Sequence, residues 1–130
     1  PEQARLIRTA REVNDAKPHW VIDKVRTKAR RFREPVIGCL GLTFKANIDD
    51  MRESPSMDIV QELVNSGIGR ILACDPNVSA AKVPFELYEL KHVLKESDIL
   101  LLLVDHEEFK EIDPEVIKDK VVIDTKGVFR

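Results

Sequence analysis

The chain has 130 residues, 43% of them hydrophobic and 34% charged, so it can bury one ordinary core and its length favours a single domain. A formal charge of −2 excludes a general attraction to nucleic acid or to an anionic membrane surface. The longest apolar run, 99–104, is far shorter than the roughly 20 residues that span a bilayer, so we expect a soluble, cytoplasmic protein that binds neither membrane nor nucleic acid.

The first part of the chain has the pattern of a basic helical segment. Apolar residues recur at helical spacing on both sides of Pro18 and predict helix over 3–33. Residues 1–35 hold ten Lys and Arg against five Asp and Glu, a net +5, and the remaining residues carry −7. Because the chain opens directly in helical periodicity with Pro1, we expect it to continue a longer polypeptide, with residues 1–34 preceding the main domain.

From residue 35 onward, short β-rich runs alternate with helix-like stretches. Runs that are apolar on both faces, such as ILLLLV, are typical of central strands in a parallel sheet. The resulting βαβαβαβ order predicts an α/β fold, a Rossmann-like doubly wound parallel sheet preceded by the helical segment. The expected strands are 36–42, 71–74, 99–104 and 121–124, and the expected helices between them are 55–66, 86–96 and 107–118.

A long polar stretch separates the first strand from the helix that follows it. About eleven residues lie between Leu42 and Ser54, whereas such elements are usually joined by about 2–6 residues. Ser54 predicts an N-cap, Pro55 the first helical position and Gly67 the end of the helix. Ligands of parallel sheets bind at the carboxyl ends of strands, near helix N-termini that favour anions. We therefore interpret residues 43–54 as an ordered binding loop suited to a phosphate.

The cysteines and glycines show no sign of a metal site or a dinucleotide fingerprint. Cys39 and Cys74 lie inside apolar runs without a second ligand at metal-binding spacing, so we expect buried, reduced thiols. Gly38 and Gly41 lack the spacing of G-x-G-x-x-G. We expect Gly38 to allow close packing of its strand and Gly41 to form a backbone turn.

Three polar residues follow the later predicted strands. Asp75 stands where a dinucleotide-binding domain carries a ribose-binding acid, but an Asp-Pro turn explains it without a ligand. Asp105 is expected to cap a short helix, and His106 to lie at the edge of the sheet. No nucleophile elbow or metal-ligand spacing surrounds them, so the chain has no evident catalytic machinery.

One alternative use of this fold is a phosphoacceptor receiver domain. Asp49 and Asp50, then Asp105, then Lys126 follow the first, third and last strands in the order that such a domain requires. The acid pair, however, stands seven residues beyond Leu42, whereas a magnesium-binding pair should lie at the mouth of the strand. The spacing therefore argues against this alternative.

The polar loop carries a long motif. GLTFKANIDDMRESPS, residues 41–56, resembles the signature of the UDP-glucose/GDP-mannose dehydrogenase family. DHEEF and DTKG look most like its UDP-N-acetyl-D-mannosamine dehydrogenase branch. The resemblance implies that 35–130 are the C-terminal, UDP-sugar-binding Rossmann-like domain and that 1–34 end the central dimerisation region. The likeness covers nearly the whole chain, continuing through AREVND, ACDPNV, VDHEEFK and VVIDTKGVF.

The same resemblance implies a reaction and its partners. Members of the family oxidise the C6 alcohol of a UDP-sugar twice to a carboxylate, reduce two NAD and pass through a thioester. This chain has neither the NAD fingerprint nor the glycine-rich stretch with the nucleophilic Cys. NAD is therefore expected to be bound mainly by a missing N-terminal domain, and the chain to be inactive alone. Expected partners are the UDP-sugar, the missing N-terminal and central domains, and further copies in a homo-oligomer.

The motif also assigns roles to individual residues. Phe44 and Lys45 match the pair that reaches the sugar nucleotide, Arg52 matches the Arg that approaches NAD, and Lys126 falls where relatives often have a substrate-contacting Arg. Asn47 replaces a common Asp, which removes a charge beside the site. Without the family, Lys45 reads equally well as a solvated lysine and Phe44 as a core residue.

A third possibility is not enzymatic. In it the domain mainly provides subunit contacts, and the apolar faces of residues 3–33 are buried against segments that this chain does not contain.

Overall fold

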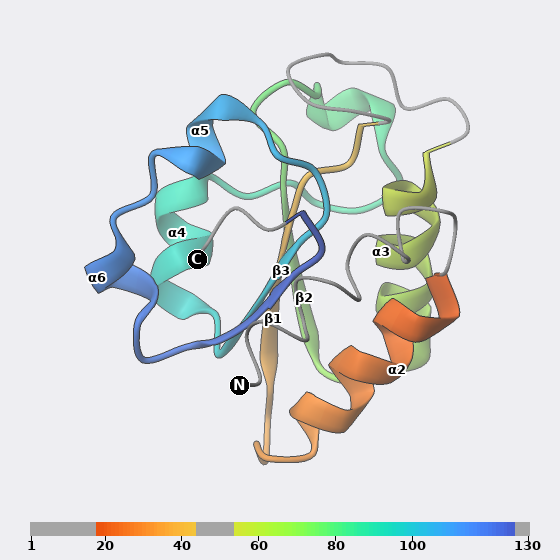
Figure 1. The fold of residues 1–130 in the computed structure, drawn as a ribbon. Coiled ribbons are helices and arrows are strands. Elements are labelled where there is room, and N and C mark those ends of the chain that lie inside the picture. The colour runs from red at the N-terminus through yellow and green to blue at the C-terminus, as the bar shows by residue number, and fades with distance from the viewer. Residues whose placement is uncertain (1–17, 44–53, 127–130) are drawn as a thin grey trace.

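The computed structural model describes residues 18–43 and 54–126, which form one parallel sheet with helices on both faces (Figure 1). The strands lie in the order β2-β1-β3-β4, and all three pairings are parallel. The predicted α/β class with a doubly wound sheet is thus confirmed. The four strands are β1 (Val36–Leu40), β2 (Arg70–Cys74), β3 (Ile99–Leu102) and β4 (Val121–Asp124).

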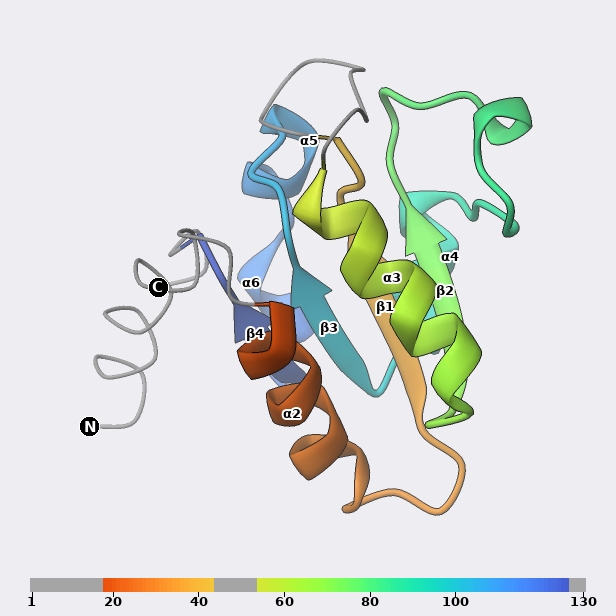
Figure 2. The same cartoon turned by 90° about the vertical axis from the view of Figure 1, so that its right-hand side faces the viewer.

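Helices cover the sheet as two outer layers. Figures 1 and 2 show the longer helices α2 and α3 on one face and the shorter α4, α5 and α6 on the other. None of the helices in the described ranges is long and apolar enough to cross a membrane. The helices are α2 (Pro18–Ala29), α3 (Pro55–Ser66), α4 (Leu90–Glu96), α5 (Glu107–Lys110) and α6 (Pro114–Ile117), with a 3-10 turn, η1, at Ala80–Lys82.

The central strand β3 shows why its sequence is apolar throughout. Ile99 and Leu101 pack into the core under α2 and α3, whereas Leu100 and Leu102 pack into the core under α4, α5 and α6. All four side chains are fully buried. Full burial of one such side chain stabilises the fold by about 1.5–3 kcal/mol, so both layers depend on this strand.

Helix α2 packs on the same sheet as the rest of the domain. Its apolar stripe, Val21, Ile22, Val25 and Ala29, is buried in the core shared with α3. The expectation that segments outside the chain cover this stripe is therefore not met for residues 18–29. The helix ends at Ala29, short of the predicted residue 33, and continues as a hydrogen-bonded turn. The division of the chain at residue 34 stays a prediction.

Two predicted helices are wrong in extent. The stretch 86–96 is helical only from Leu90, because the Tyr88 N–H pairs with the Ala73 carbonyl at 2.8 Å and keeps the preceding residues extended along β2. The stretch 107–118 is two short helices, because Asp113 caps a new helix by accepting the Glu115 N–H. Loop lengths in this part of the chain are thus set by tertiary pairing and by a second cap.

Helix α3 begins and ends where its sequence predicts. Ser54 caps it by accepting the Met57 N–H, Pro55 is its first residue, and Gly67 ends it in the left-handed conformation at φ +72°. These signals are local, which is why sequence alone locates them.

Gly38 allows the close approach that its place in β1 predicts. A Cβ at this position would collide with Ser97 Oγ and would lie 2.5 Å from Val93 Cγ1. Helix α4 and its C-cap therefore rest directly on the glycine. Ser97 Oγ is itself buried without a hydrogen-bond partner in the described part of the chain, so the contact costs the desolvation of one hydroxyl.

The two cysteines are buried and free, as predicted, and lie on opposite faces of the sheet. Burial raises the pKa of the Cys39 thiol to about 12. Burial, with the nearby carboxylates of Asp75 and Glu108, raises the pKa of Cys74 to about 12. Neither thiol is a nucleophile near neutral pH, because the thiolate is the reactive form.

These pKa values predict how stability depends on alkaline pH. Between pH 9.0 and about 12 the folded state keeps each thiol proton and the unfolded state loses it, so unfolding is favoured as pH rises. We expect each thiol to lower the free energy of unfolding by about 1.4 kcal/mol per pH unit in this window. Urea unfolding from pH 8 to 10.5 measures the slope. Cys39→Ala should remove one thiol's share, and an unchanged slope would contradict the assignment.

Candidate functional site

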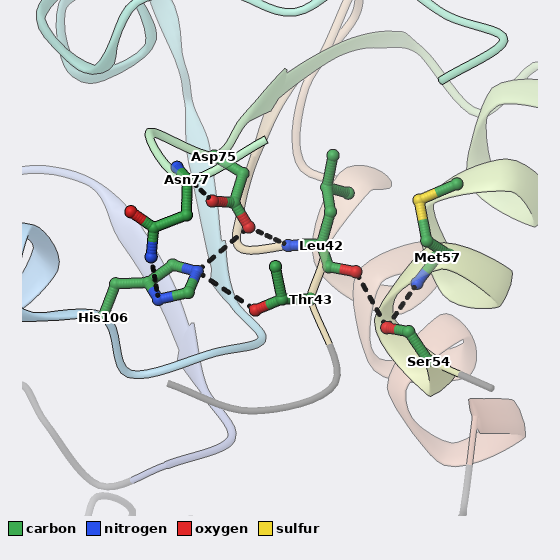
Figure 3. Close-up of polar contacts among 7 residues, drawn as sticks. All are labelled: Leu42, Thr43, Ser54, Met57, Asp75, Asn77 and His106. Atoms are coloured by element: carbon green, nitrogen blue, oxygen red, sulfur yellow. Dashed lines mark hydrogen bonds and ion pairs between the residues drawn. The ribbon is translucent and has the colours of Figure 1, made fainter. Parts of the chain in front are cut away.

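The carboxyl ends of the strands bring together polar residues that are distant in the sequence. β1 is followed by Leu42 and Thr43, β2 by Asp75, and β3 by His106 (Figure 3). The chain runs from β1 to β2 on one side and then crosses to β3 on the other, so the topological switch point lies between β1 and β3. Parallel sheets bind ligands at such points, which makes this edge the candidate site.

Asp75 is a buried carboxylate held by three N–H groups. Its Oδ2 accepts the Leu42 N–H at 2.7 Å and the His106 Nε2–H at 3.0 Å, and its Oδ1 accepts the Asn77 N–H at 2.8 Å. The last bond is the predicted Asp-Pro turn. A buried charge is tolerated only when it is paired and hydrogen-bonded, and this one is. With both oxygens engaged, Asp75 is not placed to accept the hydroxyls of a ribose.

His106 is fully buried beside this carboxylate. Asn77 Nδ2 donates to its Nδ1 at 3.1 Å, so Nε2 carries the ring proton that Asp75 accepts. Nε2 also lies 3.2 Å from Thr43 Oγ1, which links the exit of β3 to the exit of β1 across the switch point. The ring further packs against Phe109, with centroids 5.5 Å apart.

Hydrogen bonds of Leu42 hold together the residues on the two sides of segment 44–53. The Leu42 N–H donates to Asp75, and the Leu42 carbonyl accepts the Ser54 hydroxyl at 2.8 Å (Figure 3). Ser54 thereby has two functions, as N-cap of α3 and as the anchor of its start to the end of β1. The segment therefore leaves and re-enters the described structure at one point of the carboxyl edge.

Of the predicted site residues, only Lys126 lies in the described ranges. It follows β4 at the same edge, is exposed, and donates its backbone N–H to Asp124 Oδ1 at 2.9 Å. Phe44, Lys45 and Arg52 lie outside the described residues, so their proposed proximity to Lys126 stays a prediction.

Sequence reasoning named Asp75 and His106 separately but did not predict that they form one buried pair. The prediction that Asp105 caps the short helix is wrong, because His106 holds the N-cap position of α5 and makes no side-chain capping bond there. His106 lies under the edge of the sheet, fully buried. The available signal was positional: polar residues follow three consecutive strands, and parallel strands bring their carboxyl ends to one edge.

A cavity of about 420 Å³ opens beside the end of β2. Leu87, Tyr88 and Leu90 form apolar walls, and Glu89 and Glu108 contribute carboxylates. Among residues 18–43 and 54–126, no Lys or Arg lines this cavity. No cluster of three potential metal ligands occurs within residues 18–43 and 54–126.

Residues 38–130 match the UDP-binding domain of the UDP-glucose/GDP-mannose dehydrogenase family. The chain belongs to this family. Membership leaves the receiver-domain alternative without support. It confirms that the motif beginning at Gly41 is the signature of this dehydrogenase family.

Members of the dehydrogenase family resemble the chain along its whole length. An NDP-N-acetyl-D-galactosaminuronic acid dehydrogenase of Ralstonia nicotianae is 53% identical over 99% of this chain and 31% of its own length. A UDP-N-acetyl-D-mannosamine dehydrogenase of Salmonella typhi is 45% identical over the whole chain and 34% of its own length. The UDP-N-acetyl-mannosamine dehydrogenase Cap5O of Staphylococcus aureus shares the fold with a TM-score of 0.76 at 33% identity, covering all of this chain and 31% of that one. The chain thus spans about a third of the length of these dehydrogenases.

Proposed function

We propose that the chain forms the UDP-sugar-binding part of an NAD-dependent UDP-sugar 6-dehydrogenase. The observation that carries the proposal is the match of residues 38–130 to the UDP-binding domain of the family. The geometry supports it, because both flanks of segment 44–53 and the start of the Lys126 side chain lie at the carboxyl edge of one sheet. Phe44, Lys45 and Lys126 bind the sugar nucleotide in this proposal, and Arg52 approaches NAD.

The proposed substrate is UDP-N-acetyl-D-mannosamine, oxidised to UDP-N-acetyl-D-mannosaminuronate. Relatives named for N-acetyl-mannosamine and for N-acetyl-galactosaminuronic acid support an N-acetylated sugar. We further propose that the enzyme serves polysaccharide biosynthesis in the cytoplasm, where the sugar nucleotide is available.

The described residues do not fit NAD, which the rest of the dehydrogenase would hold. Asp75 occupies the ribose-binding position but is engaged by three N–H groups. Gly41 approaches Val104 so closely that a Cβ would lie 2.6 Å from the Val104 Cβ, which leaves no open glycine turn for a pyrophosphate. Both cysteines of the chain are buried, so neither supplies a thioester. We therefore propose that N-terminal and central domains, and a homo-oligomer, complete the enzyme, and that this chain alone is inactive.

Within the complete enzyme, the contribution of this chain is to bind and orient the sugar nucleotide. A Lys supplies a compact positive charge that attracts the diphosphate. Lys126 gives this charge without the bidentate geometry of Arg, so it attracts an anion more than it fixes its orientation.

We expect Lys45→Ala and Lys126→Ala, made in the complete dehydrogenase, each to lower kcat/KM for the UDP-sugar by about 10- to 150-fold. This is the effect of losing a hydrogen bond to a charged group, about 1.5–3 kcal/mol. Steady-state kinetics with UDP-N-acetyl-D-mannosamine and NAD varied separately measures it. Arg52→Ala should act more on NAD.

Lys118→Ala is the matched control, since Lys118 is an exposed lysine of the same domain whose amine pairs with Glu115. Lys118→Ala should leave kcat/KM for the UDP-sugar and kcat/KM for NAD unchanged. Wild-type kcat/KM for the sugar nucleotide in Lys45→Ala and Lys126→Ala would contradict the proposed contacts of these lysines with the sugar nucleotide and favour a domain that serves only as a subunit interface.

A further inference from the structure

The buried pair of Asp75 and His106 connects the residues that follow three strands. Asp75 from the end of β2 binds the backbone of Leu42 after β1, and His106 after β3 binds Asp75 and contacts Thr43. Neither Asp75 nor His106 exposes its side chain. The pair therefore has no direct access to a ligand, and whatever it does for a ligand it does through other residues.

We propose that Asp75 and His106 are positioning residues for the sugar-nucleotide site, acting through Leu42 and Thr43. The inference rests on the proposed function and deepens it, because it identifies what fixes Thr43 and Ser54, the described residues on either side of segment 44–53, to the sheet. It assigns no contact with substrate to either residue.

The first argument for this role is that two hydrogen bonds restrain the backbone of Leu42. One peptide unit on each side of this residue is fixed, since Asp75 holds its N–H and Ser54 holds its carbonyl. Displacing Asp75 removes one of these restraints and leaves the direction in which the chain departs after Thr43 set by fewer contacts. A displacement of about 1 Å at a binding group is enough to cost about a hundredfold in rate.

The second argument is that His106 contacts Thr43 directly. Thr43 is the last described residue before segment 44–53, and its Oγ1 is 3.2 Å from the imidazole. The imidazole is in turn held by Asn77 on its other nitrogen, which fixes the plane of the ring. Residues that follow β2 and β3 therefore restrain the position of Thr43, in addition to its covalent link to β1.

A purely structural pair would stabilise the fold and leave ligand binding unaffected below the unfolding transition. The test separates the two roles by comparing His106→Ala with Val93→Ala in the complete dehydrogenase. Val93 is equally buried and belongs to α4, in the same layer as α5, but its hydrocarbon side chain makes no hydrogen bond to the network. Both variants should lose stability, since each leaves a buried cavity.

We expect His106→Ala to raise KM for UDP-N-acetyl-D-mannosamine at least about tenfold while KM for NAD changes less than about twofold. Val93→Ala should leave both constants near wild type at a temperature where both variants are folded. His106→Gln, whose amide can donate to Asp75, should recover most of the loss. If His106→Ala does not fold, Thr43→Val, which keeps the shape and removes the hydroxyl, should still raise KM for the sugar nucleotide.

The outcomes distinguish this inference from the function on which it rests. An active wild type with unchanged sugar-nucleotide KM in His106→Ala or Thr43→Val would overturn the positioning role and leave the proposed function standing. Equal changes in His106→Ala and Val93→Ala would also overturn it. A complete wild-type protein that oxidises no UDP-sugar would overturn the proposed function, and the inference with it.

Discussion

Asp75→Ala is expected to lower the free energy of unfolding by about 3–5 kcal/mol, because it leaves three buried N–H donors without an acceptor at about 1–3 kcal/mol each. The substitution leaves the N–H groups of Leu42 and Asn77 and the imidazole of His106 without their acceptor. Domains are stable by only about 5–15 kcal/mol, so this loss is a large part of the total. Urea unfolding of the chain, followed by circular dichroism, measures it.

Asp98→Ala is the matched control. Asp98 also accepts a backbone N–H, that of Val36 at 3.0 Å, but it follows a helix, is half-buried and lies at the opposite end of the sheet. Its loss should cost about 0.5–1.5 kcal/mol, the net value of one hydrogen bond. Asp75→Asn keeps one acceptor oxygen and should fall between the two. Equal losses in Asp75→Ala and Asp98→Ala would show that the network at the carboxyl edge adds nothing beyond one bond.

Gly41→Ala is expected to destabilise the chain by about 2–5 kcal/mol, because two penalties add. Gly41 has φ +106°, a conformation that residues with a Cβ rarely adopt. An added Cβ would also lie 2.6 Å from Val104 Cβ and 2.8 Å from the Val104 backbone nitrogen. That nitrogen donates to the Leu40 carbonyl, so the backbone cannot simply move away.

Gly67→Ala separates the two penalties. Gly67 also has positive φ, +72°, but a Cβ there would meet nothing within 4 Å. It should cost about 1 kcal/mol, from backbone conformation alone. Gly41→Ala with Val104→Ala should relieve part of the steric loss. If Gly41→Ala costs no more than Gly67→Ala, the contact of Gly41 with Val104 adds no steric penalty.

The elements that sequence predicted well are those whose signals are local. The N-cap at Ser54, the first residue Pro55 and the end at Gly67 bound α3 as predicted, and strand 121–124 agrees with the structure to the residue. Burial on both faces of β3 made its apolar run recognisable without any knowledge of its neighbours. Such features depend on a few adjacent residues, and a sequence displays them directly.

The features that sequence missed depend on partners far along the chain. Tyr88 is held extended by Ala73, 15 positions earlier, and no pattern near residue 88 announces that bond. Asp75 and His106 are 31 positions apart, and a single histidine has no motif of its own. The position of residues 43–54 alone predicted a binding loop, whereas the roles of Phe44, Lys45, Arg52 and Lys126 come from the family motif and stay predictions.

The bond between Ser54 and Leu42 joins two residues 12 positions apart. Because it closes the chain at the edge of the sheet, the sheet can tolerate sequence changes in the segment between these two residues. For a closed loop, lengthening the enclosed chain from 12 to 15 residues adds only about 0.2 kcal/mol of closure entropy. Changes of length or composition between these two anchors therefore need not disturb the sheet. The sheet can in this way accept segments of different length and composition at its carboxyl edge.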